Sequence, residues 1–227
     1  MDTRWLLGLI VLRIVLLGWY ASHLPLLEKY DEANHYDVAH FIARAGRLPQ
    51  VGDAPNVADH LRIYQQYDQP PLTYLLLAPI VRLFDGSSAL LVQPAGASFC
   101  DSPPATFYIH PQQPTSELEA NWRGIRAARF VIMSLTTLAL PFIWWAGRIV
   151  TPESRHLALL ASVTYCLLPV LLDVSVWVNN DALLLLLGAM ALVPTARHAR
   201  RIATWRDDLA LLVLSIGALL TQLTGLP

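Results

Sequence analysis

The chain has 227 residues, of which 55% are hydrophobic and only 15% are charged. The apolar residues gather in long runs, which is typical of an integral membrane protein and unlike an ordinary soluble domain. The formal net charge of -1 argues against a nucleic-acid-binding surface, which needs a concentrated basic stripe to neutralise phosphates.

Five apolar runs predict five transmembrane helices. They cover residues 5–22, 125–146, 157–178, 182–196 and 209–226. Each run approaches the roughly 20 residues needed to cross a bilayer, and the short fourth run gains length if Asn179 or Asn180 is its N-cap. Asp181 then lies in the first helical turn, where the helix dipole favours a carboxylate. We therefore expect a single all-α membrane domain over residues 1–227.

Basic residues in the short loops predict the orientation of these helices. Arginines follow the second and fourth runs, whereas the turn before Asp181 has none. The residues concerned are Arg148, Arg155, Arg197, Arg200, Arg201 and Arg206. This distribution predicts a cytoplasmic amino terminus. Three arginines at the start of the second run, Arg123, Arg126 and Arg129, favour the opposite orientation.

Residues 23–124 form a long loop that is predicted to be extracytoplasmic, with eleven of the seventeen acids and five of the seven histidines. Apolar residues recur at helical spacing over 31–46, and Gly46 with Pro49 marks a stop. A second apolar stretch, 71–84, follows Pro70 and is too short to span a membrane. We expect both stretches to be helices that lie at the membrane interface.

The candidate site residues are acids close to the predicted outer surface. Asp31 and Glu32 open the first interfacial helix, Asp68 precedes two prolines, and Asp181 returns to the same side of the membrane. Paired acids at a bilayer surface indicate chemistry on a lipid-linked substrate. Arg126 and Arg129 lie one helical turn apart, where two guanidinium groups suit a phosphate.

The order of these motifs resembles a known family. Asp31-Glu32, an amphipathic helix ending in Gly-Arg-Leu-Pro, Gln69-Pro70-Pro71-Leu72, and Asn179-Asn180-Asp181 follow one another as in the amino-terminal half of C-type (GT-C) integral membrane glycosyltransferases. The most similar members are bacterial dolichyl-phosphate-mannose-protein mannosyltransferase-like and aminoarabinose-transferase-like proteins. The resemblance implies a bacterial inner-membrane enzyme that moves a sugar from a polyprenyl phosphate to an extracytoplasmic acceptor.

The resemblance also implies roles for individual residues. Asp31 would act as general base or metal ligand, with Glu32 beside it. Asp181 and Asp68 match supporting acids of the family. After Asp68, however, this chain has Gln69 where those relatives have lysine. If Asp31 and Asp181 converge, their mutual repulsion favours a divalent cation between them, and magnesium or manganese suits carboxylate oxygens.

Each residue also has a purely structural interpretation. Asp31 can be a helix N-cap, Asp181 a first-turn acid and Asp68 a turn residue. Arg126 and Arg129 can anchor a helix to lipid headgroups.

His35 and the end of the chain can also be interpreted in more than one way. His35 is expected to be a hydrogen-bonded or solvated side chain rather than a ligand. The chain ends at Pro227, whereas full members of the family carry more helices. We expect either an amino-terminal piece of a longer enzyme or a truncated relative, so a non-catalytic subunit that packs against a larger membrane complex is the alternative function.

Two ionisable residues fall within predicted spans, where an isolated charge is costly. They are Arg13 in the first run and Asp173 in the third. A structural ion pair or a contact with a protein partner is expected for both, and Arg129 is a possible partner for Asp173. A transporter is disfavoured, because no Gly- or Pro-broken helices recur in two halves of the chain.

Overall fold

The computed structural model describes residues 3–26, 29, 32–50, 69–84 and 116–222, and the regular structure within these ranges is entirely helical. The helices are α1 (Thr3–His23), α2 (Glu32–Ala45), α4 (Leu72–Phe84), α5 (Ser116–Val150), α6 (His156–Leu167), α7 (Pro169–Asp173), α8 (Asp181–Ala199) and α9 (Trp205–Leu219). Three of them contain segments long and apolar enough to cross a membrane, namely Arg4–His23, Trp122–Val150 and Asp181–Ala199. This is the architecture of a helical membrane protein.

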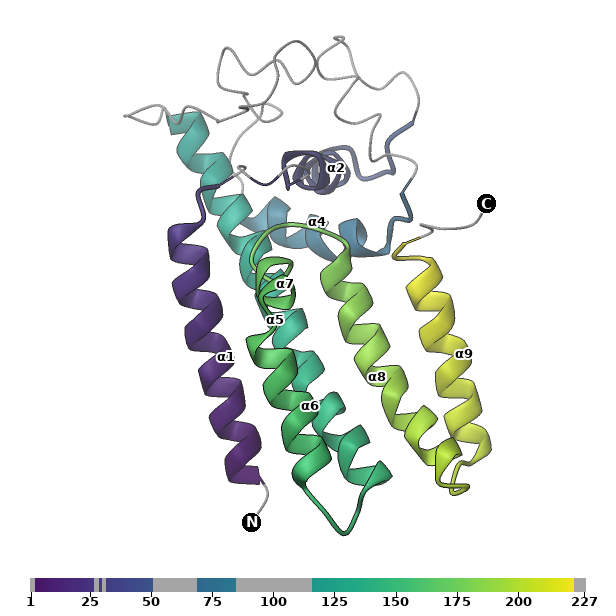
Figure 1. The fold of residues 1–227 in the computed structure, drawn as a ribbon. Helices are drawn as coiled ribbons and strands as arrows, with labels where there is room; N and C mark the ends of the chain where they lie inside the picture. The colour runs from purple at the N-terminus through teal and green to yellow at the C-terminus, as the bar shows by residue number, and fades with distance from the viewer. Residues whose placement is uncertain (1–2, 27–28, 30–31, 51–68, 85–115, 223–227) are drawn as a thin grey trace, which may run out of the picture.

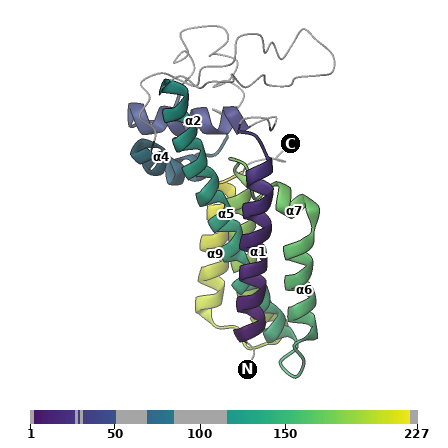
Figure 2. The same cartoon turned by 90° about the vertical axis from the view of Figure 1, so that its left-hand side faces the viewer.

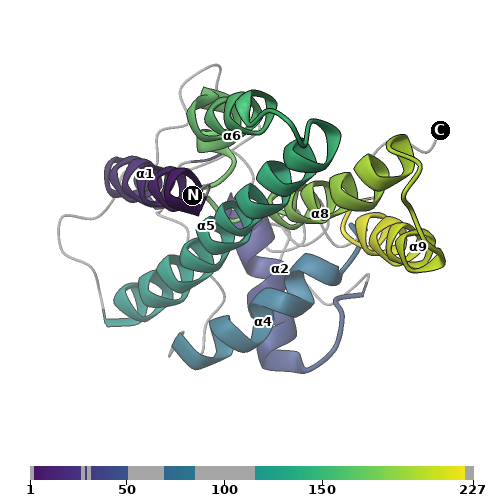
Figure 3. The same cartoon turned by 90° about the horizontal axis from the view of Figure 1, so that it is seen from below.

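Helix α5 is the centre of the bundle. Helices α1, α6 and α8 pack on it, and α9 packs on α8 (Figure 1). The view from below shows α5 passing between α1 and α6 on one side and α8 and α9 on the other (Figure 3). At Gly147 of α5 an added Cβ would lie only 2.6 Å from the Cα of Ala158 in α6. A side chain at this position would therefore push the two helices apart.

The third predicted run, 157–178, is not one helix. Helix α6 ends at Leu167, Leu168 is extended with ψ of 117°, and Pro169 begins the five-residue helix α7. Proline lacks the N–H that would continue the helix, and it disfavours a helical conformation in the residue before it. The carbonyl group of Tyr165, four residues before Pro169, consequently has no helical donor.

Arg13 of α1 supplies the missing donor. Its side chain is fully buried, and its Nη1 donates to the carbonyl oxygen of Tyr165 at 3.0 Å, while Nη2 donates to Ser175 Oγ at 2.8 Å. The guanidinium carbon also lies 4.3 Å from the centroid of the Tyr165 ring. Arg13 thus holds α1 against the broken end of α6, and its partners are carbonyl and hydroxyl oxygens rather than a carboxylate.

Asp173 has a different partner from the one suggested by the sequence. It forms an ion pair with Lys29, and the Tyr20 hydroxyl donates to it at 3.0 Å. The predicted pair between Asp173 and Arg129 is wrong, because Arg129 binds another carboxylate.

Helices α2 and α4 lie across one end of the bundle (Figures 1 and 2). Both occupy stretches in which the residue pattern predicts a helix. Eleven of the fourteen residues of α2 are buried, among them the polar side chains of Glu32, His35 and Asp37. The helix is therefore enclosed on more than its apolar face, and an amphipathic pattern alone does not predict that.

Helix α8 starts where the sequence indicates. Asp181 is its first residue and Asn180 its N-cap, but Asn180 makes no side-chain capping bond. Instead Asn179 Oδ1 accepts from the backbone N–H of Ala182 at 3.0 Å. Capping by Asn179 leaves the side chain of Asn180 free to bind elsewhere.

Candidate functional site

A buried ion pair joins α2 to α5. Arg129 Nε donates to Glu32 Oε1 and its Nη2 donates to Oε2, both at 2.6 Å. The exposed fraction is 0% for the Glu32 side chain and 4% for that of Arg129. Glu32 Oε1 also accepts from the backbone N–H of Val178 at 3.2 Å. Bidentate ion pairs of this kind are among the strongest charge-assisted hydrogen bonds in proteins.

Arg129 also fixes the chain that follows α1. Its Nη1 donates to the carbonyl oxygen of Leu24 and its Nη2 to that of Pro25, both at 2.8 Å. Four of the five guanidinium hydrogens are thus used within the protein. Sequence reasoning assigned Arg129 to a phosphate and Glu32 to catalysis, whereas in the structure the two side chains bind each other and hold α1, α2 and α5 together.

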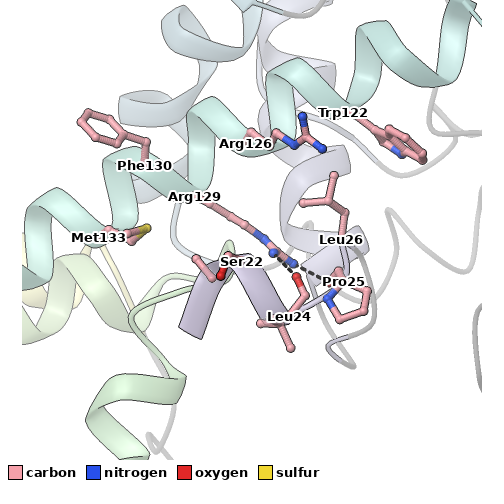
Figure 4. A pocket seen from close by; sticks show the side chains of 10 residues that line it. Ser22, Leu24, Pro25, Leu26, Trp122, Arg126, Arg129, Phe130 and Met133 are labelled. Atoms are coloured by element: carbon pink, nitrogen blue, oxygen red, sulfur yellow. Dashed lines mark hydrogen bonds between the residues drawn. The ribbon is translucent and has the colours of Figure 1, made fainter. Parts of the chain in front are cut away.

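Arg126 lies one turn before Arg129 and has a different environment. Its side chain is exposed, and no hydrogen bond or ion pair of its guanidinium occurs within the described ranges. It lines a pocket of about 540 Å³ between the end of α1 and the start of α5 (Figure 4). The other lining residues are Ala21, Ser22, Leu24, Pro25, Leu26, Trp122, Arg129, Phe130 and Met133. An apolar pocket with one available guanidinium suits an amphiphile that carries an anionic head.

A chain of side-chain hydrogen bonds links α2, α4 and the start of α8. Gln69 Oε1 accepts from Asn180 Nδ2 at 2.7 Å and from the Tyr74 hydroxyl at 3.2 Å. Tyr74 Oη lies 2.8 Å from His35 Nδ1. The Gln69 amide oxygen can only accept, so the Tyr74 hydroxyl donates its single hydrogen to Gln69 and His35 Nδ1 donates to Tyr74. Gln69 acts as a double acceptor, which a lysine side chain cannot do.

His35 is kept neutral by its surroundings. Its exposed fraction is 4%, and desolvation by burial lowers its pKa from 6.5 to about 4. Its ring stacks on Tyr74 and lies near Trp177. The sequence indicates no partner for His35, because Tyr74 is 39 residues away in the chain.

Of the three remaining predicted acids, the structure describes only Asp181. Asp31 and Asp68 lie outside the described residues, whereas Glu32 and Gln69, which follow them, lie within. Glu32 is bonded to Val178, and Gln69 is bonded to Asn180. These two contacts bring the segments that follow Asp31 and Asp68 against the turn that precedes Asp181.

Asp181 opens onto a groove of about 560 Å³ between α7 and α8. This groove has no lining residue in common with the pocket at Arg126. Asp181 and Arg126 therefore face separate spaces.

No group of three or more potential metal ligands occurs among the residues that the structure describes. Since Asp31 is outside those residues, the suggested cation between Asp31 and Asp181 stays a prediction. Comparisons with protein-family models, curated proteins and solved structures found no match to this chain.

Proposed function

We propose that this chain is the amino-terminal part of a membrane glycosyltransferase that moves a sugar from a polyprenyl phosphate to an extracytoplasmic acceptor. One observation supports the proposal above others. The segments next to Asp31, Asp68 and Asp181 are tied together through the Glu32–Val178 and Gln69–Asn180 hydrogen bonds. The pocket that Arg126 lines adjoins this cluster, because Arg129 belongs to both.

In this proposal each group has a chemical task. The donor phosphate binds Arg126 and its isoprenoid chain follows the apolar wall of the pocket. Asp31 removes a proton from the acceptor hydroxyl or amine as that atom attacks the sugar, and the bond from the sugar to the phosphate oxygen breaks. Arg126 offsets the charge on the departing phosphate. Glu32 is next to Asp31 in the chain and Arg129 is one helical turn from Arg126, so the Glu32–Arg129 ion pair positions Asp31 and Arg126.

Asp68 and Asp181 act as supporting acids, on the acceptor side in the case of Asp181. A magnesium or manganese ion held by Asp31 and Asp181 remains part of the proposal. The proposed topology has five membrane-spanning segments, with α6 and α7 together forming the third and α9 the fifth. It places the amino terminus in the cytoplasm of a bacterial cell and α2 and α4 at the outer interface of the inner membrane.

The test measures sugar transfer by the full-length gene product in vesicles that contain a polyprenyl-phosphate sugar. Asp31→Asn should reduce turnover by about 100-fold or more, since general bases contribute about 10² to 10⁴. Arg126→Gln should raise KM for the donor by about tenfold, the effect of losing one charge-assisted hydrogen bond. Arg123→Gln is the matched control, because Arg123 is exposed on the same helix and does not line the pocket. Equal effects of the Arg126 and Arg123 substitutions would remove Arg126 from the proposed site.

A second candidate function is a non-catalytic subunit of a larger membrane complex. The observation that favours it is the Glu32–Arg129 pair, in which two predicted site residues satisfy each other and leave little capacity for a substrate. Purification in mild detergent distinguishes the two functions. A stable complex without transferase activity supports the subunit, and a free monomer with activity argues against it.

A further inference from the structure

The groove at Asp181 follows one face of α8. Its α8 wall consists of residues spaced three or four apart, which share a helical face. They are Asp181, Leu184, Leu185, Gly188, Ala189 and Leu192. Eleven helical rises separate Asp181 from Leu192, which corresponds to a length of about 16 Å along the helix. The groove therefore has the length and apolar lining that a hydrocarbon chain requires.

The opposite wall exists because α6 is interrupted. Tyr165, Val170, Leu171 and Val174 form that wall, and Ile143 of α5 lies between the two walls. Helices α6 and α8 both pack on α5, and the break at Leu168 turns the chain aside above α6. Gly188 adds to the open space, since no atom lies within 4 Å of the position that its Cβ would occupy.

One charged group lies at the end of this apolar groove. Asp181 is half-buried, and its carboxylate accepts a hydrogen bond from the Gln222 side chain. No lysine, arginine or histidine of the described ranges forms an ion pair with it. A carboxylate beside apolar walls is costly without a cationic partner. It also repels the phosphate of an anionic lipid.

We propose that the groove binds a membrane amphiphile whose single apolar chain ends in a protonated amine. The ammonium group donates to Asp181, and the chain lies along α8 toward Leu192. A neutral head would leave the carboxylate without a counter-charge. This site is separate from the pocket at Arg126. The ammonium group takes the place at Asp181 of the divalent cation suggested above, so the amine and that cation do not bind together.

The test uses the protein in lipid nanodiscs with two photoreactive probes of equal chain length, an alkylamine and the corresponding alkyl alcohol. Each probe carries a diazirine at the chain end, and mass spectrometry locates the labelled residues. The amine should label residues near Leu192 at least about tenfold more efficiently than the alcohol, because a hydrogen bond between charged groups is worth a factor of ten or more. A diazirine placed next to the amine should instead label residues near Leu184.

Two variants localise the effect, and a third controls for it. Asp181→Asn keeps the shape of the side chain and should abolish the preference for the amine. Gly188→Leu fills the groove and should remove labelling by both probes. Gly18→Leu, on α1 at a position that is also open, should change neither. Equal labelling by the amine and the alcohol in the unaltered protein would overturn the proposal and identify the groove as a seat for bulk lipid. An amine preference that survives Asp181→Asn would equally overturn it.

Discussion

Of the arginines that the structure describes, Arg129 and Arg13 are buried, and each is stabilised in a different way. Arg129 lies at the end of the bundle covered by α2, where Glu32 supplies both carboxylate oxygens. Arg13 lies inside the bundle, where the break between α6 and α7 supplies carbonyl and hydroxyl oxygens. Arg129 is stabilised by an oppositely charged residue. Arg13 is stabilised without one, by oxygen atoms at an interrupted helix whose backbone carbonyl lacks a helical donor.

The two solutions differ in what their loss should cost. Removing one member of a buried ion pair leaves a buried charge without a counter-charge. Replacing Arg13 by an apolar residue removes the charge itself. One of its acceptors also keeps another donor, because the Leu171 carbonyl, 3.5 Å from Arg13 Nη2, accepts from Ser175 Oγ as well. The region around α2 should therefore be more sensitive to substitution than the region around Arg13.

The largest effect is expected from Glu32→Gln. The glutamine keeps the size of the side chain but leaves the Arg129 guanidinium without a counter-charge, so the free energy of unfolding should fall by about 3–5 kcal/mol. Equilibrium unfolding in detergent measures this change. The double variant Glu32→Gln with Arg129→Met removes both charges and should recover part of the loss. A loss below about 1 kcal/mol for the single variant would show that the pair is dispensable.

A pH effect should follow from His35, which the same region buries in the neutral form. Its pKa is about 4 in the folded protein and 6.5 ordinarily. Between about pH 6.5 and 4, His35 therefore binds a proton in the unfolded chain but not in the folded protein. The free energy of unfolding should decline as the pH falls through this range. The contribution is at most about 3 kcal/mol. His35→Gln should flatten the decline over this range, whereas His156→Gln, at an exposed position, serves as control. An identical pH profile for both variants would contradict this assignment.

An intermediate effect is expected from Arg13→Met. The carbonyl oxygen of Tyr165 loses its donor, and the free energy of unfolding should fall by about 1–3 kcal/mol. Pro169→Ala provides a backbone N–H and allows α6 to continue, so adding it to Arg13→Met should recover part of this loss. Thermal unfolding of the two variants tests the idea. If Pro169→Ala changes the stability of the Arg13→Met variant by the same amount as that of the unaltered protein, then Arg13 does not act as the donor to the Tyr165 carbonyl.

The smallest effect is expected from Gln69→Lys. Lysine has three donors and no acceptor, so the hydrogen bonds from Asn180 and Tyr74 are lost at a cost of about 1 kcal/mol. Gln69→Glu retains the acceptor oxygens and is the matched comparison. Unfolding measurements on both variants should show the lysine variant as the less stable one. The reverse order would mean that Gln69 does not serve mainly as an acceptor.

Local sequence patterns predicted the local features of this fold. Apolar spacing and the stop at Gly46 indicated α2, and the asparagines before Asp181 indicated the start of α8. The break at Pro169 was missed, because the apolar run continues on both sides of it and hydropathy does not report hydrogen bonding. Burial of polar residues in α2 was missed for a related reason, since amphipathic spacing says nothing about what covers the polar face.

The site was predictable only in part, because its contacts join distant segments. Glu32 and Arg129 are 97 residues apart, and neither residue type nor spacing shows that they meet. Arg13 was recognised as unusual from its place in an apolar run, but its backbone partners carry no signature in the sequence. The identification of Arg126 as an available cation rests on the structure, since Arg126 and Arg129 have the same local pattern.

The contacts of Arg13 bear on the order in which this protein is assembled. Its acceptors lie 152 and 162 residues later in the chain. At a synthesis rate of about 5–20 residues per second, they emerge about 8–30 s after the arginine does. Until α6 and α7 are synthesised, the guanidinium of α1 must therefore be hydrogen-bonded by water, lipid headgroups or another protein. The final position of α1 in the bilayer is set by a segment that is synthesised much later.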